Sequence, residues 1–299
     1  MLQTMQIEES IQRYVERNEI RTLASPALMD YHVHDNRSRD APNATIDGYV
    51  ERAEQLGIKE IAFTTHLRVS GIENSTSIRP NEITEYLNDI WRAQETTEVV
   101  LKTGFEVDYI PEDERKIAHL IDEYDLDCVL GSVHEVDGVN IATGKTPEPY
   151  FNNRNITEAI DQYYEVWRMA IESEIFDVMS HPDYFRKYKK APIYWKDYGG
   201  AVYDAIDSLK SYGVGYEINT SGYRHGIYDK FPCDKFIWAA AKAGVKTVTL
   251  GSDSHITDTI GYRAKESAQL LEELGYKTVS TFNARKEHTI PLKKVMDSK

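Results

Sequence analysis

Two histidines of this sequence stand at a spacing that suits metal binding. His32 and His34 are separated by one residue in the segment DYHVH, which follows the apolar residues ALM. If this segment is a strand, its side chains alternate between two faces, so both imidazoles point to the same side. They then lie about 7 Å apart along the strand, and together they can bind one ion. Because so short a motif also occurs by chance at half-exposed strand ends, the rest of the sequence has to decide between these interpretations.

The same kind of predicted strand recurs along the chain. Short apolar runs rich in β-branched residues are each followed by a helical pattern, and an eighth run, YKTVSTF, comes after the last helix. The expected strands span residues 27–33, 58–64, 99–105, 128–132, 176–179, 214–218 and 247–250, and the expected helices span residues 46–56, 81–94, 112–124, 157–173, 195–211, 234–243 and 263–274. Gly57, Gly213 and Gly244 each separate a helix from the next strand, where a glycine commonly ends a helix.

This alternation of strands and helices predicts the fold class. It is typical of an α/β protein with a parallel sheet and helices outside it. Seven or eight units without an internal linker favour one closed (β/α) barrel over two open sheets. We therefore expect residues 27–299 to form a single barrel domain. Residues 1–26 have an amphipathic spacing, which predicts an additional N-terminal helical extension.

Potential ligands follow the C-terminal end of every predicted strand. In a parallel barrel these ends lie on one face, where the loops after the strands build the active site. They carry six of the nine histidines and several carboxylates: His32 and His34 with Asp40 in the following loop, His66, Glu106 and Asp108, His134, His181 and Asp183, Glu217 and Asn219, and Asp253 and His255. Solvated strand ends have no reason to be rich in histidine, whereas imidazole together with carboxylate suits zinc, manganese or iron. The set exceeds the needs of one ion, so we predict two or three divalent transition-metal ions.

Seven of these segments, in their order along the chain, resemble the motifs of the PHP (polymerase and histidinol phosphatase) family. They are DYHVH, TTH, GFEVD, GSVH, SHPD, EINTSG and GSDSH, and the resemblance runs from about residue 28 to about residue 290. Within the family, HPDYFRKY, EINTSGYR and GYKTVSTFNARKEHTIPL look most like the stand-alone histidinol-phosphate phosphatases. The resemblance implies a distorted (β/α)7 barrel of the TIM-like PHP type with a trinuclear metal centre.

The resemblance assigns nine metal ligands at matching positions. One ion would be held by His32, His34, Glu106 and Asp253, a second by Glu106, His134 and His181, and a third by Asp40, His66 and His255. Some family members have histidine at the position of Asp40, and the harder aspartate ligand moves the metal preference toward manganese or iron.

The activity that the resemblance implies is hydrolysis of L-histidinol phosphate to L-histidinol and phosphate, a step of histidine biosynthesis. A metal-activated hydroxide is the expected nucleophile at neutral pH, and arginine is expected to help neutralise the phosphoryl oxygens. Arg186 in HPDYFRKYKK and Arg224 in TSGYRHG are the predicted phosphate-binding residues. The proton donor to the leaving alkoxide stays open between a metal-bound water, Asp183 and His225.

Other functions fit part of the same pattern. A PHP phosphoesterase for a nucleotide or sugar phosphate would have an identical metal core and would differ in the long loops after His66 and His134. A non-catalytic PHP module of a polymerase assembly is disfavoured by the complete ligand set. An amidohydrolase-type deacetylase usually has a lysine between its metals, and no predicted strand ends in one.

The composition is typical of a soluble globular protein. Of 299 residues, 41% are hydrophobic, and 35 basic against 49 acidic residues give a net charge of −14. This charge offers no overall attraction to nucleic acid or anionic membranes, so any anion must be held by a local cluster of positive charge or by metal. The ligands that the family resemblance implies are a small phosphate ester and inorganic phosphate. Cys128 and Cys233, without a CxxC motif, fit a reducing compartment. The charged N-terminal segment is typical of neither a signal peptide nor a membrane span, which favours the cytoplasm. The oligomeric state is not indicated.

Overall fold

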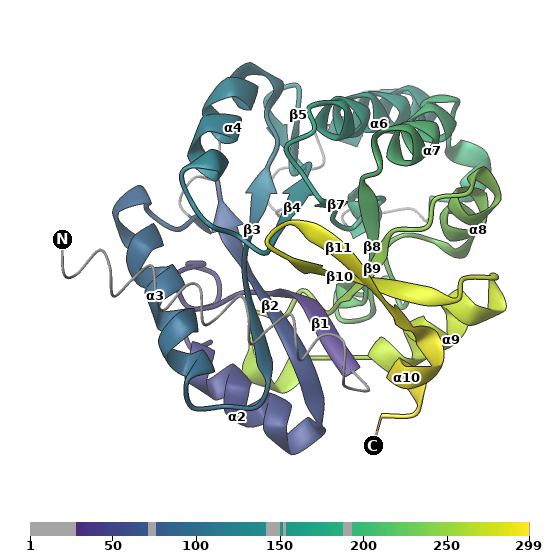
Figure 1. Cartoon of the computed structure of the whole chain (residues 1–299). Helices are drawn as coiled ribbons and strands as arrows, with labels where there is room; N and C mark the ends of the chain where they lie inside the picture. The colour runs from purple at the N-terminus through teal and green to yellow at the C-terminus, as the bar shows by residue number, and fades with distance from the viewer. Residues whose placement is uncertain (1–27, 71–75, 142–149, 152–153, 188–192, 299) are drawn as a thin grey trace.

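Seven parallel strands form the centre of the molecule. The computed structural model describes residues 28–298 except 71–75, 142–149, 152–153 and 188–192 (Figure 1). The strands are hydrogen-bonded in the order β1 (Leu28–Val33), β2 (Ile58–Leu67), β3 (Val100–Asp108), β4 (Cys128–Ser132), β7 (Val178–Met179), β8 (Gly215–Asn219) and β9 (Val248–Gly251). Because consecutive parallel strands lie side by side, their C-terminal ends gather at one end of the sheet.

The first and last strands of the sheet meet and nearly close it into a barrel. The backbone N–H of His34 donates to the carbonyl of Ser254 at 2.9 Å, and the N–H of Ser254 donates to the carbonyl of His32 at 3.1 Å. Next to this bridge, the buried carboxylate of Asp30 accepts hydrogen bonds from the N–H of Ser252 at 2.9 Å and of Gly261 at 2.7 Å. The predicted single seven-stranded barrel is confirmed.

Helices pack around the outside of the barrel, as the alternating pattern predicts (Figure 1). They are α2 (Ile46–Leu56), α3 (Ile83–Gln94), α4 (Glu114–Asp122), α6 (Ile156–Glu172), α7 (Ala201–Tyr212), α8 (Asp234–Ala243) and α9 (Ala264–Glu273). Their ends follow local rules: the Asn155 side chain caps α6 by accepting from the N–H of Thr157 at 2.9 Å. Gly213 ends α7 with a φ of 70°. None of the helices in the described ranges has the length and apolar character needed to span a bilayer.

One predicted helix differs from that in the structure. The helix expected over residues 195–211 begins only at Ala201, after a separate turn at Trp195–Asp197. Gly199 and Gly200 lie between the two, and glycine disfavours helix because of its backbone freedom. The predicted N-terminal helix of residues 1–26 lies outside the described residues.

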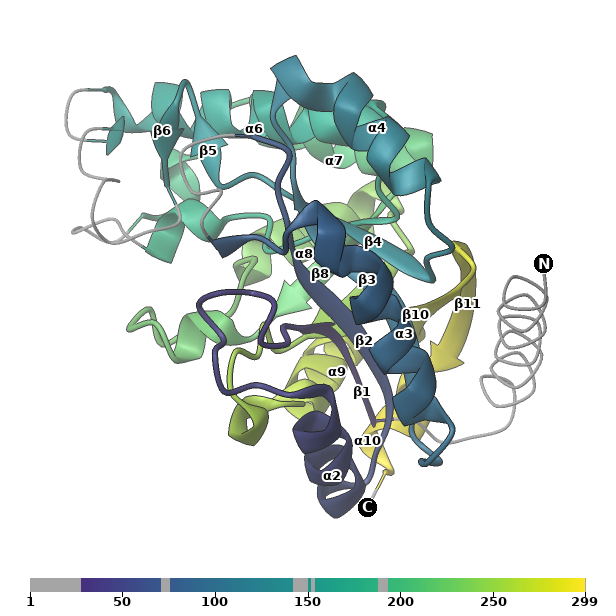
Figure 2. The same cartoon turned by 90° about the vertical axis from the view of Figure 1, so that its left-hand side faces the viewer.

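The eighth apolar run becomes a hairpin rather than an eighth barrel strand. β10 (Thr278–Asn283) pairs antiparallel with β11 (Lys286–Pro291), and α10 (Leu292–Met296) follows. Figure 2 shows this hairpin at one end of the barrel and the short hairpin of β5 (Glu135–Val136) and β6 (Val139–Asn140), which follows β4, at the other. Buried Lys102 donates to Asn283 at 2.8 Å and so ties β10 to β3. The C-terminal hairpin therefore covers the barrel end opposite the predicted site.

Candidate metal centre

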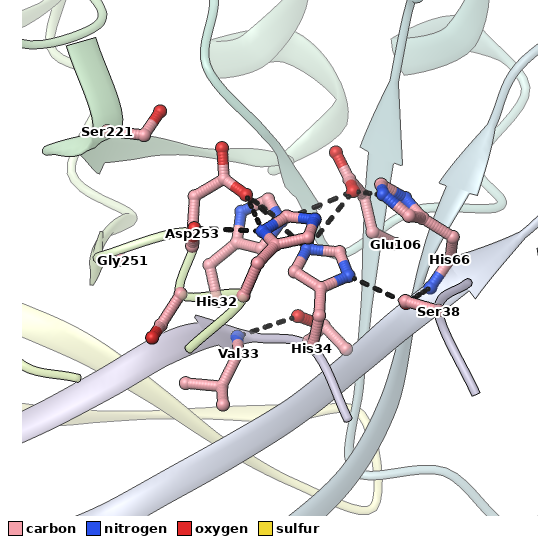
Figure 3. A network of polar contacts seen from close by, with 12 residues as sticks. His32, Val33, His34, Ser38, His66, Glu106, Ser221, Gly251 and Asp253 are labelled. Atoms are coloured by element: carbon pink, nitrogen blue, oxygen red, sulfur yellow. Dashed lines mark hydrogen bonds and ion pairs between the residues drawn. The ribbon is translucent and has the colours of Figure 1, made fainter. Parts of the chain in front are cut away.

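Glu106 lies at the centre of the predicted ligand set. The parallel register of β2 and β3 places it beside His66, and its side chain is buried. Its Oε2 atom lies 2.8 Å from His66 Nδ1, 3.3 Å from His32 Nε2 and 3.5 Å from His34 Nε2 (Figure 3). Three imidazoles from two strands thus converge on one carboxylate oxygen.

The second carboxylate oxygen of Glu106 faces two further histidines. Its Oε1 atom lies 2.8 Å from His181 Nε2 and 3.6 Å from His134 Nε2. The two histidine Nε2 atoms are 3.3 Å apart. His181 follows β7 and His134 follows β4, so neighbouring barrel strands deliver both rings to the same place. Glu106 is therefore positioned to bridge two ligand groups.

Asp253 faces Glu106 across the histidine pair of β1. Its Oδ1 atom lies 3.5 Å from His34 Nε2, 3.8 Å from His32 Nε2 and 3.4 Å from His255 Nδ1. The backbone φ of Asp253 is 55°, a left-handed conformation that costs a non-glycine residue about 1–3 kcal/mol. Such strain is common where the surrounding structure holds a functional side chain in place.

Asp40 forms the outer part of the cluster. Its Oδ2 atom lies 3.3 Å from His255 Nε2 and 3.5 Å from His66 Nε2. The Asp40 side chain is 41% exposed, whereas those of His32 and Glu106 are almost fully buried. The structure thus brings all nine predicted ligands together, with a buried inner part and a more exposed outer part.

The cluster fits metal ions chemically. Three groups have ligand atoms within 4.8 Å of one another: His32, His34 and Glu106; Glu106, His134 and His181; and His34, His66 and His255. The buried Nε2 atoms of His32 and His34 and the buried Oε2 atom of Glu106 make no hydrogen bond. Buried polar atoms are nearly always satisfied, so nitrogen and oxygen atoms left unsatisfied and aimed at one another form a donor set that could hold a transition-metal ion.

Electrostatics keeps the carboxylate at the centre ionised. Burial opposes ionisation of Glu106, but the positive charges of His32, His66 and His134 outweigh it and hold the pKa of Glu106 well below its usual range. Burial likewise opposes the charged form of His66, but Glu106 and Asp40 outweigh it and raise the pKa of His66 to about 10. At neutral pH the Glu106 side chain is therefore an anionic carboxylate, which is the form that binds a cation.

A second layer of polar residues holds the histidine rings. Glu217 Oε1 lies 2.9 Å from His32 Nδ1, and Asp108 Oδ1 lies 2.8 Å from His134 Nδ1. Carboxylates on the far nitrogen of a ligating histidine fix its tautomer and orientation. Both residues stood among the polar strand ends, but nothing in the sequence paired each with its histidine, because the pairs join different strands.

A cavity of about 590 Å³ opens beside the cluster. Its described lining includes three basic residues, Arg68, Lys187 and Arg224, together with His225. Burial, followed by the positive charge of Lys187, lowers the pKa of His225 to about 4, so its ring is uncharged at neutral pH.

Arg186 and Asp183 are not among the described residues that line this cavity. The Arg186 guanidinium donates to Asp183 Oδ2 at 3.1 Å and to Asp229 Oδ2 at 2.6 Å. Asp183 is fully buried and also accepts from the hydroxyl of Tyr198 at 3.0 Å and the N–H of Cys233 at 2.9 Å. Of the two arginines predicted from the sequence to bind phosphate, Arg224 lines the cavity and Arg186 does not. Lys187, the neighbour of Arg186, and Arg68, to which the sequence analysis gave no role, line it as well.

Fold and site together define a metal-binding α/β barrel, and comparison with known proteins identifies its family. The PHP domain profile matches residues 30–221, and the chain belongs to the PHP family. It is 26% identical over 265 residues to a probable histidinol-phosphatase of Deinococcus radiodurans, covering 87% of this chain and 98% of the relative. It is 25% identical over 266 residues to a histidinol-phosphatase of Lactococcus lactis, covering 86% and 95%.

A solved structure has the same fold. The histidinol phosphate phosphatase of Lactococcus lactis, complexed with zinc, L-histidinol and phosphate, superposes with a TM-score of 0.77 at 23% identity. The match covers 87% of this chain and 98% of that protein.

Proposed function

We propose that this chain is a metal-dependent phosphatase that hydrolyses L-histidinol phosphate to L-histidinol and phosphate. The observation that carries the proposal is the convergence of nine predicted ligand residues, Glu106 among them, in one cluster beside a cavity with basic residues in its wall. The relatives named histidinol-phosphatase support the substrate, and the chain spans nearly their whole length.

The inner ligands would hold two ions bridged by Glu106: one with His32, His34 and Asp253, and the other with His134 and His181. The outer group of Asp40, His66 and His255 would hold a third ion. Bound ions of this kind supply a strong nucleophile at neutral pH and neutralise charge on the phosphoryl oxygens. The zinc complex of the Lactococcus lactis protein supports zinc, and the Asp40 carboxylate is equally suited to manganese or iron.

Arg224 and Lys187 would bind the phosphate from the cavity wall. Arg224 Nη2 donates to the backbone carbonyls of Ser252 at 2.6 Å and Asp253 at 3.1 Å, which holds the guanidinium beside the ligand strand β9. Its Nη1 atom is buried and makes no hydrogen bond, so this atom is available to an anion. Lys187 Nζ lies 2.6 Å from the Tyr184 hydroxyl, and the Tyr184 ring packs at a tilt of 30° against the His181 ring, with centroids 4.1 Å apart. Tyr184 thereby links Lys187 to the predicted metal ligand His181.

The proposal is tested by phosphate release from the full-length chain supplied with manganese or zinc. The rate with histidinol phosphate is compared with the rates with a nucleoside monophosphate and a sugar phosphate. We expect kcat/KM of about 10⁴ M⁻¹s⁻¹ or above for histidinol phosphate, and a preference over the other esters of at least about tenfold. If kcat/KM for the nucleotide or the sugar phosphate were at least about tenfold higher than for histidinol phosphate, the proposed substrate would be wrong.

Two variants separate metal chemistry from general folding effects. Glu106→Gln should lose bound metal and activity together, because the bridging carboxylate is removed. Glu60→Gln is the matched control: Glu60 is also a buried carboxylate, but it lies on β2 away from the ligand cluster and contacts the Tyr31 hydroxyl. Full activity and metal content in Glu106→Gln would contradict the metal-dependent function.

A further inference from the structure

Arg68 is a buried cation at the edge of the metal centre to which the proposed phosphatase chemistry gives no role. It directly follows β2, and the pairing of Leu67 with Val107 places it beside Asp108 of β3. Its side chain is 2% exposed and forms part of the cavity wall. A guanidinium so fully withdrawn from water needs partners that compensate its charge.

Its partners lead to a metal ligand. Arg68 Nε lies 2.7 Å from Asp108 Oδ2, while Asp108 Oδ1 lies 2.8 Å from His134 Nδ1. His134 Nε2 in turn lies 3.3 Å from His181 Nε2 and 3.6 Å from Glu106 Oε1. One carboxylate thus joins a buried cation to a histidine whose other nitrogen faces the metal centre.

The other carboxylate behind a histidine ring is held differently. Glu217, which contacts His32, accepts from the Asn219 amide at 3.0 Å and from the backbone N–H of His181 at 3.1 Å. These neutral donors hold Glu217 in place from its own strand and from the neighbouring strand. Asp108 is held instead by an ion pair with Arg68, which takes the place of the neutral donors to Glu217.

We propose that Arg68 is a positioning residue that holds the Asp108 carboxylate beside His134 Nδ1, so that His134 Nε2 faces the ion bound with Glu106 and His181. Without Arg68, Asp108 is a buried carboxylate only two residues from Glu106 on the same face of β3. Repulsion between the two then favours a rotation of Asp108 away from His134. The inference rests on the metal-dependent function proposed above, but its test reads metal binding and needs no substrate.

The test measures zinc affinity by competition with a chromophoric chelator, using the full-length chain and its Arg68→Met, Arg68→Lys and Asp108→Asn variants. We expect Arg68→Met to weaken the binding of one zinc equivalent by about 10- to 100-fold, the usual effect of losing such support. Arg68→Lys should recover part of this loss because it restores the charge. In the Asp108→Asn background, Arg68→Met should add less than about threefold, because both changes break the same chain of contacts.

Arg285→Met is the matched control. Arg285 pairs with Asp177 at 3.0 Å and lies at the turn of the C-terminal hairpin, at the opposite end of the barrel. This variant should lower thermal stability and leave zinc affinity unchanged. Unchanged zinc affinity in Arg68→Met, or an equal loss in Arg285→Met, would overturn the inference.

The double variant distinguishes positioning from a direct contact. An undiminished effect of Arg68→Met in the Asp108→Asn background would overturn the inference, because Arg68 would then act on the bound ions without Asp108. Failure of the chain to hydrolyse histidinol phosphate, with the zinc results as expected, would overturn the proposed substrate and leave the role of Arg68 standing.

Discussion

At the scale of single residues, one carboxylate organises the site. Glu106 lies within 3.6 Å of five histidines, which are His32, His34, His66, His134 and His181. Five imidazoles can approach so closely only if most of them are neutral or share a negative partner. Because histidines contact both oxygens of Glu106, this side chain connects the two inner groups of predicted ligands.

The cavity cations lead to a prediction about phosphate binding. Arg224→Ala and Lys187→Ala should each lower kcat/KM by about 10- to 100-fold, because each removes a charge-assisted hydrogen bond of roughly 1.5–3 kcal/mol. Metal content, measured by inductively coupled plasma mass spectrometry, should stay the same. Unchanged kinetics in both variants would contradict a phosphate-binding role.

Arg186→Ala provides the comparison for these variants. Its guanidinium is 11% exposed and paired with the fully buried Asp183, so its removal leaves an uncompensated buried charge. We expect the free energy of unfolding to fall by about 3 kcal/mol. The effect on kcat/KM should be smaller than that of Arg224→Ala. A large kinetic loss with normal stability would instead support the phosphate-binding role predicted for Arg186 from the sequence.

At the scale of elements, strand register and residue alternation bring the ligands together. β2 and β3 pair in parallel with His66 opposite Glu106, and side chains two residues further along face the same side. A one-residue slip in this register would turn every ligand of one strand to the other face. Each helix between two strands must therefore end at a defined residue, because its end sets the residue at which the next strand begins.

The end of α7 allows a matched test of this requirement. Gly213 has a φ of 70° with no atom near an added Cβ, so Gly213→Ala tests the backbone conformation alone. We expect a loss of about 1–2 kcal/mol in unfolding free energy, measured by urea denaturation. Gly200, at the start of the same helix, also has open space but a φ of −74°. Gly200→Ala should be neutral or stabilise by up to about 1 kcal/mol. Equal effects of the two changes would contradict this account.

At the scale of the whole molecule, the metal centre joins strands that are distant in sequence. The predicted ligands come from β1, β2 and β3 and from the segments after β1, β4, β7 and β9. The last of these, which carries Asp253 and His255, lies where β9 meets β1 and the barrel closes. Ions that bind only the folded chain should stabilise the whole barrel by mass action.

The protonation of His66 predicts how stability depends on pH in the metal-free protein. Its pKa in the folded chain is raised to about 10, against about 6.5 in an unfolded chain. The resulting stabilisation is fully present below pH 6.5 and is lost as pH rises toward 10. We expect the Tm of chelator-treated protein to fall over this range, since each kcal/mol of lost stabilisation lowers the Tm of a domain of about 250 residues by roughly 2–4 °C.

Two histidine variants check this pH dependence by differential scanning fluorimetry. His66→Gln should remove most of the fall in Tm between pH 6.5 and 9.5. His119→Gln should retain it, because His119 is 82% exposed on α4 and far from the ligand cluster. The same fall in all three proteins would show that His66 is not its origin.

The fold and the positions of the candidate ligands could be predicted from the sequence because both depend on local order along the chain. Hydrophobic runs alternating with helical patterns predict a parallel barrel, and a parallel barrel gathers its strand ends on one face whatever the details of packing. Residues such as His66 and Glu106 at those ends therefore had to converge.

The tertiary structure alone decided which neighbouring residues complete the site. The turn Tyr184–Lys187 orients two adjacent basic residues differently, so Lys187 reaches the cavity while Arg186 pairs with the buried Asp183 and the partly exposed Asp229. The contacts from Asp108 to His134 and Arg68 likewise join separate strand ends, and their distances depend on register and barrel curvature. A linear pattern specifies the type and order of side chains. The direction in which each one points depends on packing between elements far apart in the sequence.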